Sequence, residues 1–139
     1  MDAINHIPNR PSVIAQWARL LKPRGRLLFT DPVTVTGPLT NEEIAVRSSV
    51  GFMPFVPKDY DKEVIALSGL RLLECRNVTA NMAEVAEKRR AAREKRSAAV
   101  RRIEGDRTYE AQQTFLAMAS RLAAEGRLSR FVYVSEKGS

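Results

Sequence analysis

The sequence predicts an α/β fold in which a small three-stranded sheet is combined with helices that include one long pair. Three short apolar segments, at about residues 26–30, 70–78 and 128–136, are predicted to be buried strands. A helical pattern, a tight break and then the first apolar segment follow one another as they do in α/β domains. Two longer segments, at about 80–104 and 108–125, have helical periodicity and give the helical pair.

The first helix is predicted to begin at Asn9, whose side chain can accept a hydrogen bond from the first turn. Pro11 lies in that turn, where a missing N–H costs nothing. The apolar residues that follow recur on one helical face: Val13, Ile14, Trp17, Leu20 and Leu21. Pro23 and Gly25 end the helix just before the first strand.

The segment 31–38 contains two prolines and a glycine and is predicted to be a loop. Thr40 and Glu43 have capping-box spacing and predict a helix that runs to about Ser48. The segment 51–57 is rich in Phe, Met and Pro without a clear period, so it is predicted to be an irregular apolar loop.

A brief helix is predicted to begin at Asp59 or Asp61 and to end at Gly69, immediately before the second strand. The long helical segments 80–104 and 108–125 are ended by Gly105 and Gly126. Residues 1–139 are too few for two full domains and are assigned to a single domain.

The net charge of +7 invites a nucleic-acid hypothesis, but the distribution of charge argues against it. Eight of the 23 basic residues lie between Lys88 and Arg102, where alanine and glutamate residues alternate with them. This pattern is typical of a long solvated helix with opposite charges at helical spacing. No aromatic residue interrupts the run to stack on bases.

The composition is that of an ordinary globular protein, with 44% hydrophobic and 28% charged residues. No apolar stretch approaches the ~18–20 residues that span a bilayer, and the first residues lack the layout of a secretory signal. The single cysteine, Cys75, excludes an intramolecular disulfide and fits a reducing compartment. We therefore expect a cytoplasmic protein that does not enter a membrane, with Cys75 as a buried, inert thiol.

One segment carries a family resemblance: Leu20-Leu21-Lys22-Pro23-Arg24-Gly25-Arg26-Leu27-Leu28-Phe29-Thr30-Asp31. It resembles the LKPGG turn and fifth strand of class I S-adenosylmethionine-dependent methyltransferases. Residues 2–7 look like the family's segment after the fourth strand, which lines the methyl-transfer pocket. The final helix, the Gly126 turn and residues 131–134 resemble its closing strand. The helical pair is similar to a substrate-side insertion in some small-molecule methyltransferases.

The resemblance implies an incomplete Rossmann-like methyltransferase fold with a mixed sheet. The family sheet has seven strands, the last of which is antiparallel and inserted between the fifth and sixth. This chain would keep three of them, in the spatial order first, third, second. It would thus be the C-terminal half of a methyltransferase whose parent family uses S-adenosylmethionine on a small acceptor.

Two departures from the family pattern bear on the cofactor. Arg24 replaces the first glycine of the turn, a small change provided that the position keeps ordinary backbone angles. The glycine-rich loop after the first strand and the acidic residue that ends the second are both absent. Glycines let the backbone approach the cofactor, and the carboxylate accepts hydrogen bonds from ribose hydroxyls. We therefore assign no cofactor-binding residues and expect this chain alone to bind no S-adenosylmethionine.

Loss of the neighbouring strands would leave the strand at 26–30 at an edge of the sheet. Its apolar sequence makes a poor edge, because an unpaired flat apolar strand invites pairing with another chain. We expect the chain to form a homodimer or to pair with a separate N-terminal half-domain at this edge.

The candidate catalytic residue is His6, the only histidine, which could act as a general base near neutral pH or could merely cap or pack. Asn5 in the same segment and Asp31 at the end of a strand are candidate substrate-binding residues, and Asp31 could instead form a turn before Pro32.

Glu43 and Arg47 lie one helical turn apart and could clamp a substrate or form an exposed ion pair. Phe52, Met53 and Phe55 could line an apolar pocket or pack under a loop, whereas Trp17 is assigned to the core. One histidine and one cysteine do not suggest a metal site.

Three functions are consistent with the sequence. The first is a methyltransferase-like domain that is inactive alone. The second is a non-catalytic, homo-oligomeric interaction domain that assembles through the exposed strand edge. The third is nucleic-acid binding through the basic helix.

Overall fold

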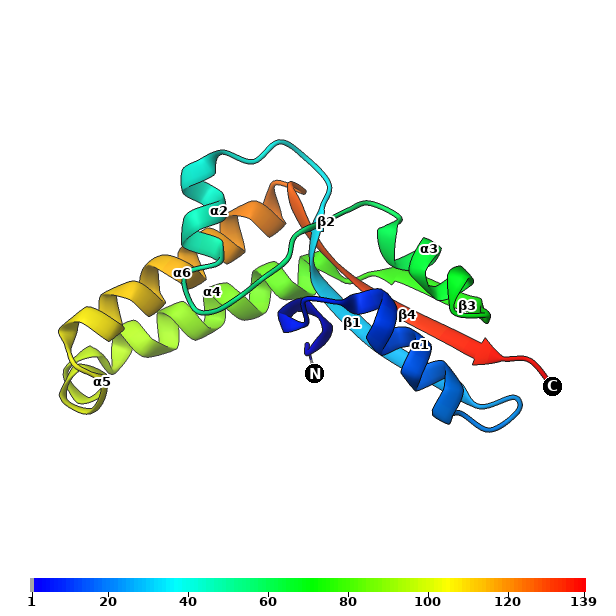
Figure 1. Cartoon of the computed structure of the whole chain (residues 1–139). Helices are drawn as coiled ribbons and strands as arrows, with labels where there is room; N and C mark the ends of the chain where they lie inside the picture. The colour runs from blue at the N-terminus through cyan, green and yellow to red at the C-terminus, as the bar shows by residue number, and fades with distance from the viewer. Residues whose placement is uncertain (1) are drawn as a thin grey trace.

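A mixed four-stranded sheet forms the centre of the chain, for which the computed structural model describes residues 2–139. The strands are β1 (Arg26–Val35), β2 (Val56–Pro57), β3 (Leu70–Asn77) and β4 (Leu128–Lys137), and their order is β2-β1-β4-β3 (Figure 1). β4 is antiparallel to both β1 and β3, whereas β2 is parallel to β1. The predicted positions of three strands and their order in space are confirmed.

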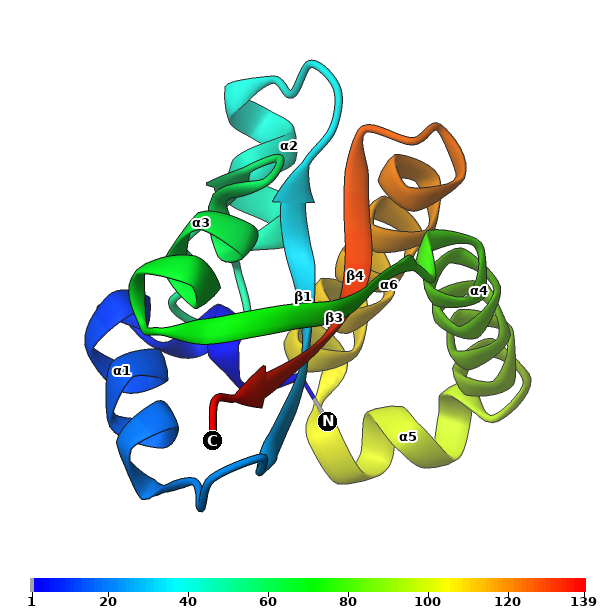
Figure 2. The same ribbon diagram turned by 90° about the vertical axis from the view of Figure 1, so that its right-hand side faces the viewer.

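The helices lie on two sides of this sheet (Figure 2). They are the 3₁₀ helix η1 (Ile4–His6) and the α-helices α1 (Arg10–Leu20), α2 (Asn41–Arg47), α3 (Tyr60–Leu67), α4 (Thr79–Lys95), α5 (Ser97–Glu104) and α6 (Asp106–Ala124). α1 and α3 cover one face of the sheet, and the pair α4–α6 projects from its other side, with α5 at the far tip (Figure 1).

The predicted helix starts are confirmed by their caps. The Asn9 side chain accepts a hydrogen bond from the Ser12 N–H at 3.1 Å. Thr40 and Glu43 form a complete capping box at the start of α2, with each side chain accepting from the other's backbone N–H. Asp59 precedes α3, as one of the two predicted starts required, but its side chain makes no capping hydrogen bond.

The three-strand prediction is wrong by one short strand, because β1 is longer than expected. Residues 31–38 were expected to form a loop, but β1 runs on to Val35, where Thr34 and Val35 pair with β2. The register of β1 against β4 shifts between Asp31 and Thr34. This irregularity accommodates Pro32, which has no N–H to give to a regular ladder.

The prediction of one helix over 80–104 is also wrong. Arg96 leaves the helical conformation, with φ −114° and ψ 25°, and separates α4 from α5. α5 then carries the chain across so that α6 can return alongside α4. Arg93 closes the corner with hydrogen bonds of 2.9 and 2.7 Å to the two carboxylate oxygens of Glu104.

Arg24 does not have ordinary backbone angles. Its replacement of the family's first turn glycine is therefore not the small change that ordinary angles would have made it. Its φ is +63°, in the left-handed region that favours glycine. Its N–H donates to the carbonyl of Lys137 at 3.1 Å, so the turn is held against the end of β4.

One face of the sheet is packed and the other is incompletely covered. The main core lies between the sheet, η1, α1 and α3, and its buried residues are Ile4, Ile14, Ala18, Phe29, Val64, Ile65, Leu70 and Tyr133. Trp17 packs against this core from its rim, as expected. On the opposite face Leu28 is 63% exposed, and its cross-strand neighbour Val134 is only half-buried.

Candidate functional site

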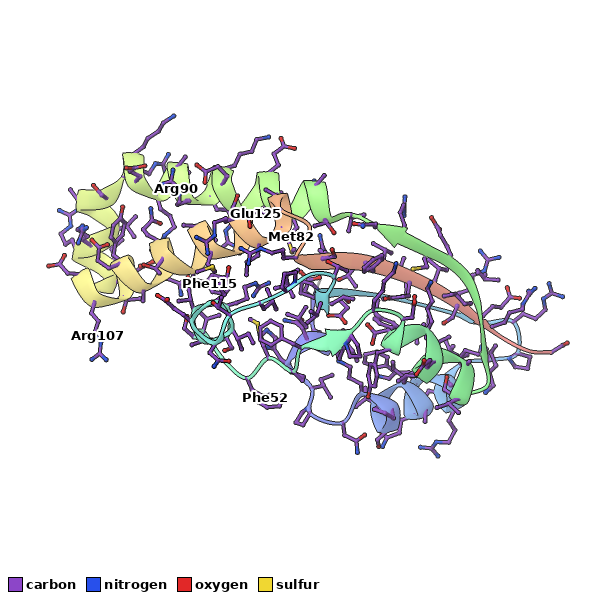
Figure 3. All side chains as sticks on the ribbon, turned by 90° about the horizontal axis from the view of Figure 1, so that it is seen from above. Phe52, Met82, Arg90, Arg107, Phe115 and Glu125 are labelled. Carbon is purple, nitrogen blue, oxygen red and sulfur yellow. The ribbon has the colours of Figure 1, made fainter. Side chains whose placement is uncertain are left out.

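A cavity of about 390 Å³ opens near the carboxyl end of β1, where α/β folds commonly bind ligands. Its apolar wall comes from the helical pair and the loop after α2, through Met53, Met82, Val85, Phe115 and Leu116. Figure 3 shows Phe115 and Met82 between the helical pair and the loop that carries Phe52. The polar side chains on the wall are Asp2, Asn5, His6, Arg47, Asn81, Arg89 and Arg130.

The hydrogen bonds of His6 define its tautomer. Nδ1 lies 2.9 Å from the carbonyl oxygen of Phe52, which can only accept, so Nδ1 carries the proton. Nε2 is then an acceptor, and it receives a hydrogen bond from Nδ2 of Asn5 at 3.2 Å. Both predicted residues therefore lie together at the cavity, with the basic nitrogen of His6 covered by the amide of Asn5.

Arg47 reaches the same cavity from α2 and is only 5% exposed. Its guanidinium lies 5.0 Å from the ring centroid of Phe115, and Nη1 contacts the sulfur of Met53 at 3.2 Å. Burial lowers the pKa of Arg47 to about 10, against the attraction of Asp2 and Asp31. The side chain thus stays charged at neutral pH in largely apolar surroundings.

Asp2 is the one carboxylate on the cavity wall, and it is already paired. Nε of Arg130 lies 3.1 Å from its Oδ1, and the hydroxyl of Thr30 donates to the same oxygen. Arg89, on the exposed face of α4, contributes a further positive charge. The wall therefore carries three arginines against one carboxylate.

Asp31 lies behind this wall, in the core, and is fully buried. Its carboxylate accepts hydrogen bonds from Arg10, from the Val33 N–H at 2.9 Å and from the Thr34 hydroxyl at 3.4 Å. The structure thus turns Asp31 toward the strand irregularity and Arg10. Its role in substrate binding stays a prediction.

Arg10 joins Asp31 to a second buried carboxylate. Nη1 of Arg10 donates to Asp31 and to Asp61 at 3.0 Å, while Nη2 donates to the carbonyl of Pro54 at 3.2 Å. Burial, a hydrogen bond to Asp31 and repulsion from it raise the pKa of Asp61 to about 8, against the opposing effect of Arg10. This network ties α1, α3 and β1 to one another in the core.

Glu43 does not pair with Arg47 but contacts two arginines at and just beyond the C-terminal end of α6. Its carboxylate lies 2.6 Å from Nη2 of Arg127 and 3.0 Å from Nη2 of Arg121. These bonds and the capping box lower the pKa of Glu43 to about 2. Glu43 and Arg47 therefore have different partners, and Glu43 secures the helix that presents Arg47.

Sequence reasoning did not foresee how deeply two arginines are buried. Arg10 is 2% exposed and Arg47 is 5% exposed. Arg47 was expected to clamp a substrate or to form an exposed ion pair with Glu43, and no role was predicted for Arg10. The available signal for Arg10 was its place in the first turn of α1, directly after the cavity segment. The signal for Arg47 was the apolar loop that follows α2.

The cavity does not fit S-adenosylmethionine by itself. No glycine contributes to its wall within the described residues, and the four described glycines with positive φ are scattered singly along the chain, at Gly51, Gly69, Gly105 and Gly126. Among residues 2–139 the only carboxylate on the wall is that of Asp2, which is paired with Arg130 and so is not free for ribose hydroxyls. Over residues 2–139 no group of three or more metal-binding side chains comes together, and no helix is long and apolar enough to cross a membrane.

Comparison with solved structures identifies the fold. A protein described as a sarcosine dimethylglycine methyltransferase from Galdieria sulphuraria matches 99% of this chain with a TM-score of 0.86 and 20% identity. Phosphoethanolamine N-methyltransferase 2 of Haemonchus contortus, solved with phosphomonomethylethanolamine and S-adenosylhomocysteine, matches 99% with a TM-score of 0.88 and 18% identity. A cyclopropane synthase from Mycobacterium tuberculosis matches 99% with a TM-score of 0.88 and 17% identity.

The chain has the fold of part of a class I methyltransferase. The predicted resemblance is thereby confirmed at the level of fold. The chain covers 50% of the Galdieria protein, 32% of the Haemonchus enzyme and 53% of the mycobacterial one, so it spans a third to a half of their lengths. No family model matches the sequence, and no curated protein is significantly similar to it.

Proposed function

We propose that this chain is the acceptor-binding half of an S-adenosylmethionine-dependent methyltransferase acting on a small molecule, and that it is inactive alone. The cavity at the carboxyl end of β1 carries the proposal, because it brings His6 and Asn5 to an apolar pocket of small-molecule size. The methyltransferase fold of the chain supports this assignment.

The half that holds the cofactor is proposed to lie against the open side of β1. Thr34 and Val35 of β1 pair with β2. Elsewhere, the described residues of β1 pair only with β4. Leu20 and Leu28, which are 74% and 63% exposed, border an apolar hollow along this side. A homodimer through the same edge would cover the leucines but would supply no site for the cofactor.

The contribution of this chain is to bind, orient and deprotonate the acceptor. With Nδ1 of His6 fixed by the Phe52 carbonyl, Nε2 is the nitrogen that can take a proton. An acceptor that displaces the Asn5 amide from Nε2 would place its own N–H or O–H at that atom. The base is thus masked until an acceptor enters.

The test is to express the chain together with the polypeptide encoded immediately before it, as one chain or as two. We expect a one-to-one assembly that binds S-adenosylmethionine in calorimetry, while this chain alone does not. A Leu28→Lys variant should lose the assembly when the two are separate chains. Binding of S-adenosylmethionine by the isolated chain would contradict the proposal, as would an assembly that fails to bind it.

The competing hypothesis of a non-catalytic interaction domain predicts assembly without cofactor binding, so the same experiment separates the two. The nucleic-acid hypothesis is weakened by the pairing of the basic residues. Arg90 contacts Glu87 at 2.7 Å and Glu94 at 3.2 Å, and Lys88 contacts Glu84. Much of the positive charge on α4 is therefore already neutralised locally.

A further inference from the structure

Two buried polar atoms beside the cavity have no hydrogen-bond partner among the described residues: Oδ1 of Asn5 and Nε of Arg47. The two residues are 3% and 5% exposed. A buried polar atom left unpaired costs about 1–3 kcal/mol, and such atoms are rare in folded proteins. One of these atoms is an acceptor and the other a donor, so a single ligand with complementary groups could satisfy both.

The donor belongs to a cation that has no anion in direct contact within the described part of the chain. The guanidinium of Arg47 touches a sulfur and an aromatic ring, neither of which carries a negative charge. The two carboxylates that attract it have their own partners, since Asp2 is bound by Arg130 and Asp31 by Arg10. A buried cation of this kind is stabilised strongly by an anion that forms charge-assisted hydrogen bonds.

The acceptor atom lies next to the candidate base. The amide nitrogen of Asn5 is bonded to Nε2 of His6, so rotation of this side chain would expose Oδ1 and uncover Nε2 together. A ligand N–H that donates to Oδ1 would then lie beside the nitrogen that can remove a proton. The same amide therefore links recognition of an N–H group to release of the base.

We propose that the acceptor molecule carries both an anionic group, bound by Arg47, and an N–H group, bound by Oδ1 of Asn5. This inference rests on the proposed function and adds the substrate class: a small anionic amine. The cavity volume of about 390 Å³ limits the ligand to a small molecule. Arg89 and Arg130 on the wall favour the same negative charge.

The test follows ligand binding by NMR of the full chain labelled at the methionine methyl groups. Met53 and Met82 line the cavity, whereas Met118 does not and serves as an internal reference. The probes are phosphoethanolamine and glycine, which carry both groups, and phosphocholine, which carries the anion without an N–H. Inorganic phosphate supplies the anion alone, and ethanolamine supplies the N–H group alone.

We expect phosphoethanolamine or glycine to shift the methyl signals of Met53 and Met82 saturably. Inorganic phosphate alone and ethanolamine alone should bind at least tenfold more weakly. Arg47→Met should weaken binding at least tenfold, Arg47→Lys should weaken it less, and Arg107→Met, on the exposed start of α6, should change nothing. Asn5→Ala should weaken phosphoethanolamine or glycine but leave phosphocholine unchanged. The preferred probe shows whether the anion is a phosphate or a carboxylate.

Three outcomes would overturn the inference. The Arg47→Met variant could bind the preferred probe as tightly as the unmodified chain, ethanolamine could bind more tightly than phosphate, or no probe could give a saturable shift. Arg47→Lys covers the case in which Arg47→Met does not fold. If the probes fail while the assembled protein still binds S-adenosylmethionine, the substrate class is wrong and the proposed function stands. If the probes bind as expected but no cofactor-binding assembly forms, the proposed function fails instead.

Discussion

Nη1 of Arg10 lies 3.0 Å from Oδ1 of Asp61, 51 residues later in the chain, and the same nitrogen donates to Asp31. One buried cation therefore holds two buried acidic side chains at the place where α1, α3 and β1 meet. The junction of these three elements therefore depends on this network rather than on apolar packing alone.

Arg10→Met should be the most destabilising single substitution in the network. Among the described residues it removes the only direct counter-charge of Asp31, which is fully buried, and a hydrogen-bond donor of the buried Asp61. Breaking a buried pair in this way costs about 3–5 kcal/mol. Urea unfolding measures the loss, and Arg19→Met, on the exposed last turn of the same helix, should change the free energy of unfolding by less than about 0.5 kcal/mol. Similar effects of the two substitutions would contradict the prediction.

The stability of the chain should fall as pH rises from about 4 toward 8. The pKa of Asp61 is about 8 in the folded chain, against about 3.9 for an unfolded aspartate. The folded state thus binds more protons than the unfolded state across this window, so the free energy of unfolding falls with rising pH. Asp61→Asn should flatten this dependence in urea unfolding at pH 5 and pH 8. Glu63→Gln, exposed on the same helix, should retain it.

Glu43→Gln should lower the thermal midpoint at pH 7 but have a smaller effect near pH 2. The pKa of Glu43 is about 2 in the folded chain, against about 4.3 unfolded. The stabilisation from its charge is therefore full above pH 4.3 and is lost as pH falls through 2. Glutamine keeps an oxygen for the Thr40 N–H, so the variant isolates the charge. The exposed Glu42→Gln variant is the control, and an equal loss at both pH values would count against the assignment.

Arg24→Gly should stabilise the chain. A non-glycine residue at φ +63° costs roughly 1–2 kcal/mol. Glycine removes this strain but also raises the conformational entropy of the unfolded state, which offsets part of the gain in stability. We expect the free energy of unfolding to rise by roughly 0.5–1 kcal/mol in urea titrations. Arg24→Ala keeps the strained angle and should give no such gain. A loss of stability in the glycine variant would show that the Arg24 side chain matters more than its backbone.

The isolated chain should self-associate at micromolar concentration, because Leu28 leaves apolar surface on an open strand. Leu28→Lys should shift sedimentation profiles toward monomer without lowering stability. Leu67→Lys is a matched control, since Leu67 is 87% exposed but lies outside the hollow beside β1. An unmodified chain that sediments as a folded monomer at all micromolar concentrations would refute this expectation.

Local signals predicted the helices well, because their causes are local. The Asn9 cap and the Thr40–Glu43 capping box depend on residues three positions apart, which the sequence displays directly. The order of the strands came instead from the family resemblance, because pairing between residues such as Leu28 and Val134 has no local signature.

The missed features arise from tertiary contacts. Pro32 suggested a loop, yet the pairing of β1 with β4 and β2 extends the strand beyond it. The sequence 80–104 is helical throughout by composition, and only the return of α6 requires the corner at Arg96. Burial of Arg47 depends on Phe115, which lies far along the chain.

Trp17 is the only tryptophan in the chain, and it borders the same apolar hollow as Leu20 and Leu28. Its indole ring is therefore a native fluorophore placed at the surface where another half-domain would dock. Covering the hollow would remove water from the ring and move its emission to shorter wavelength. The chain can thus report its own assembly optically, without an attached dye.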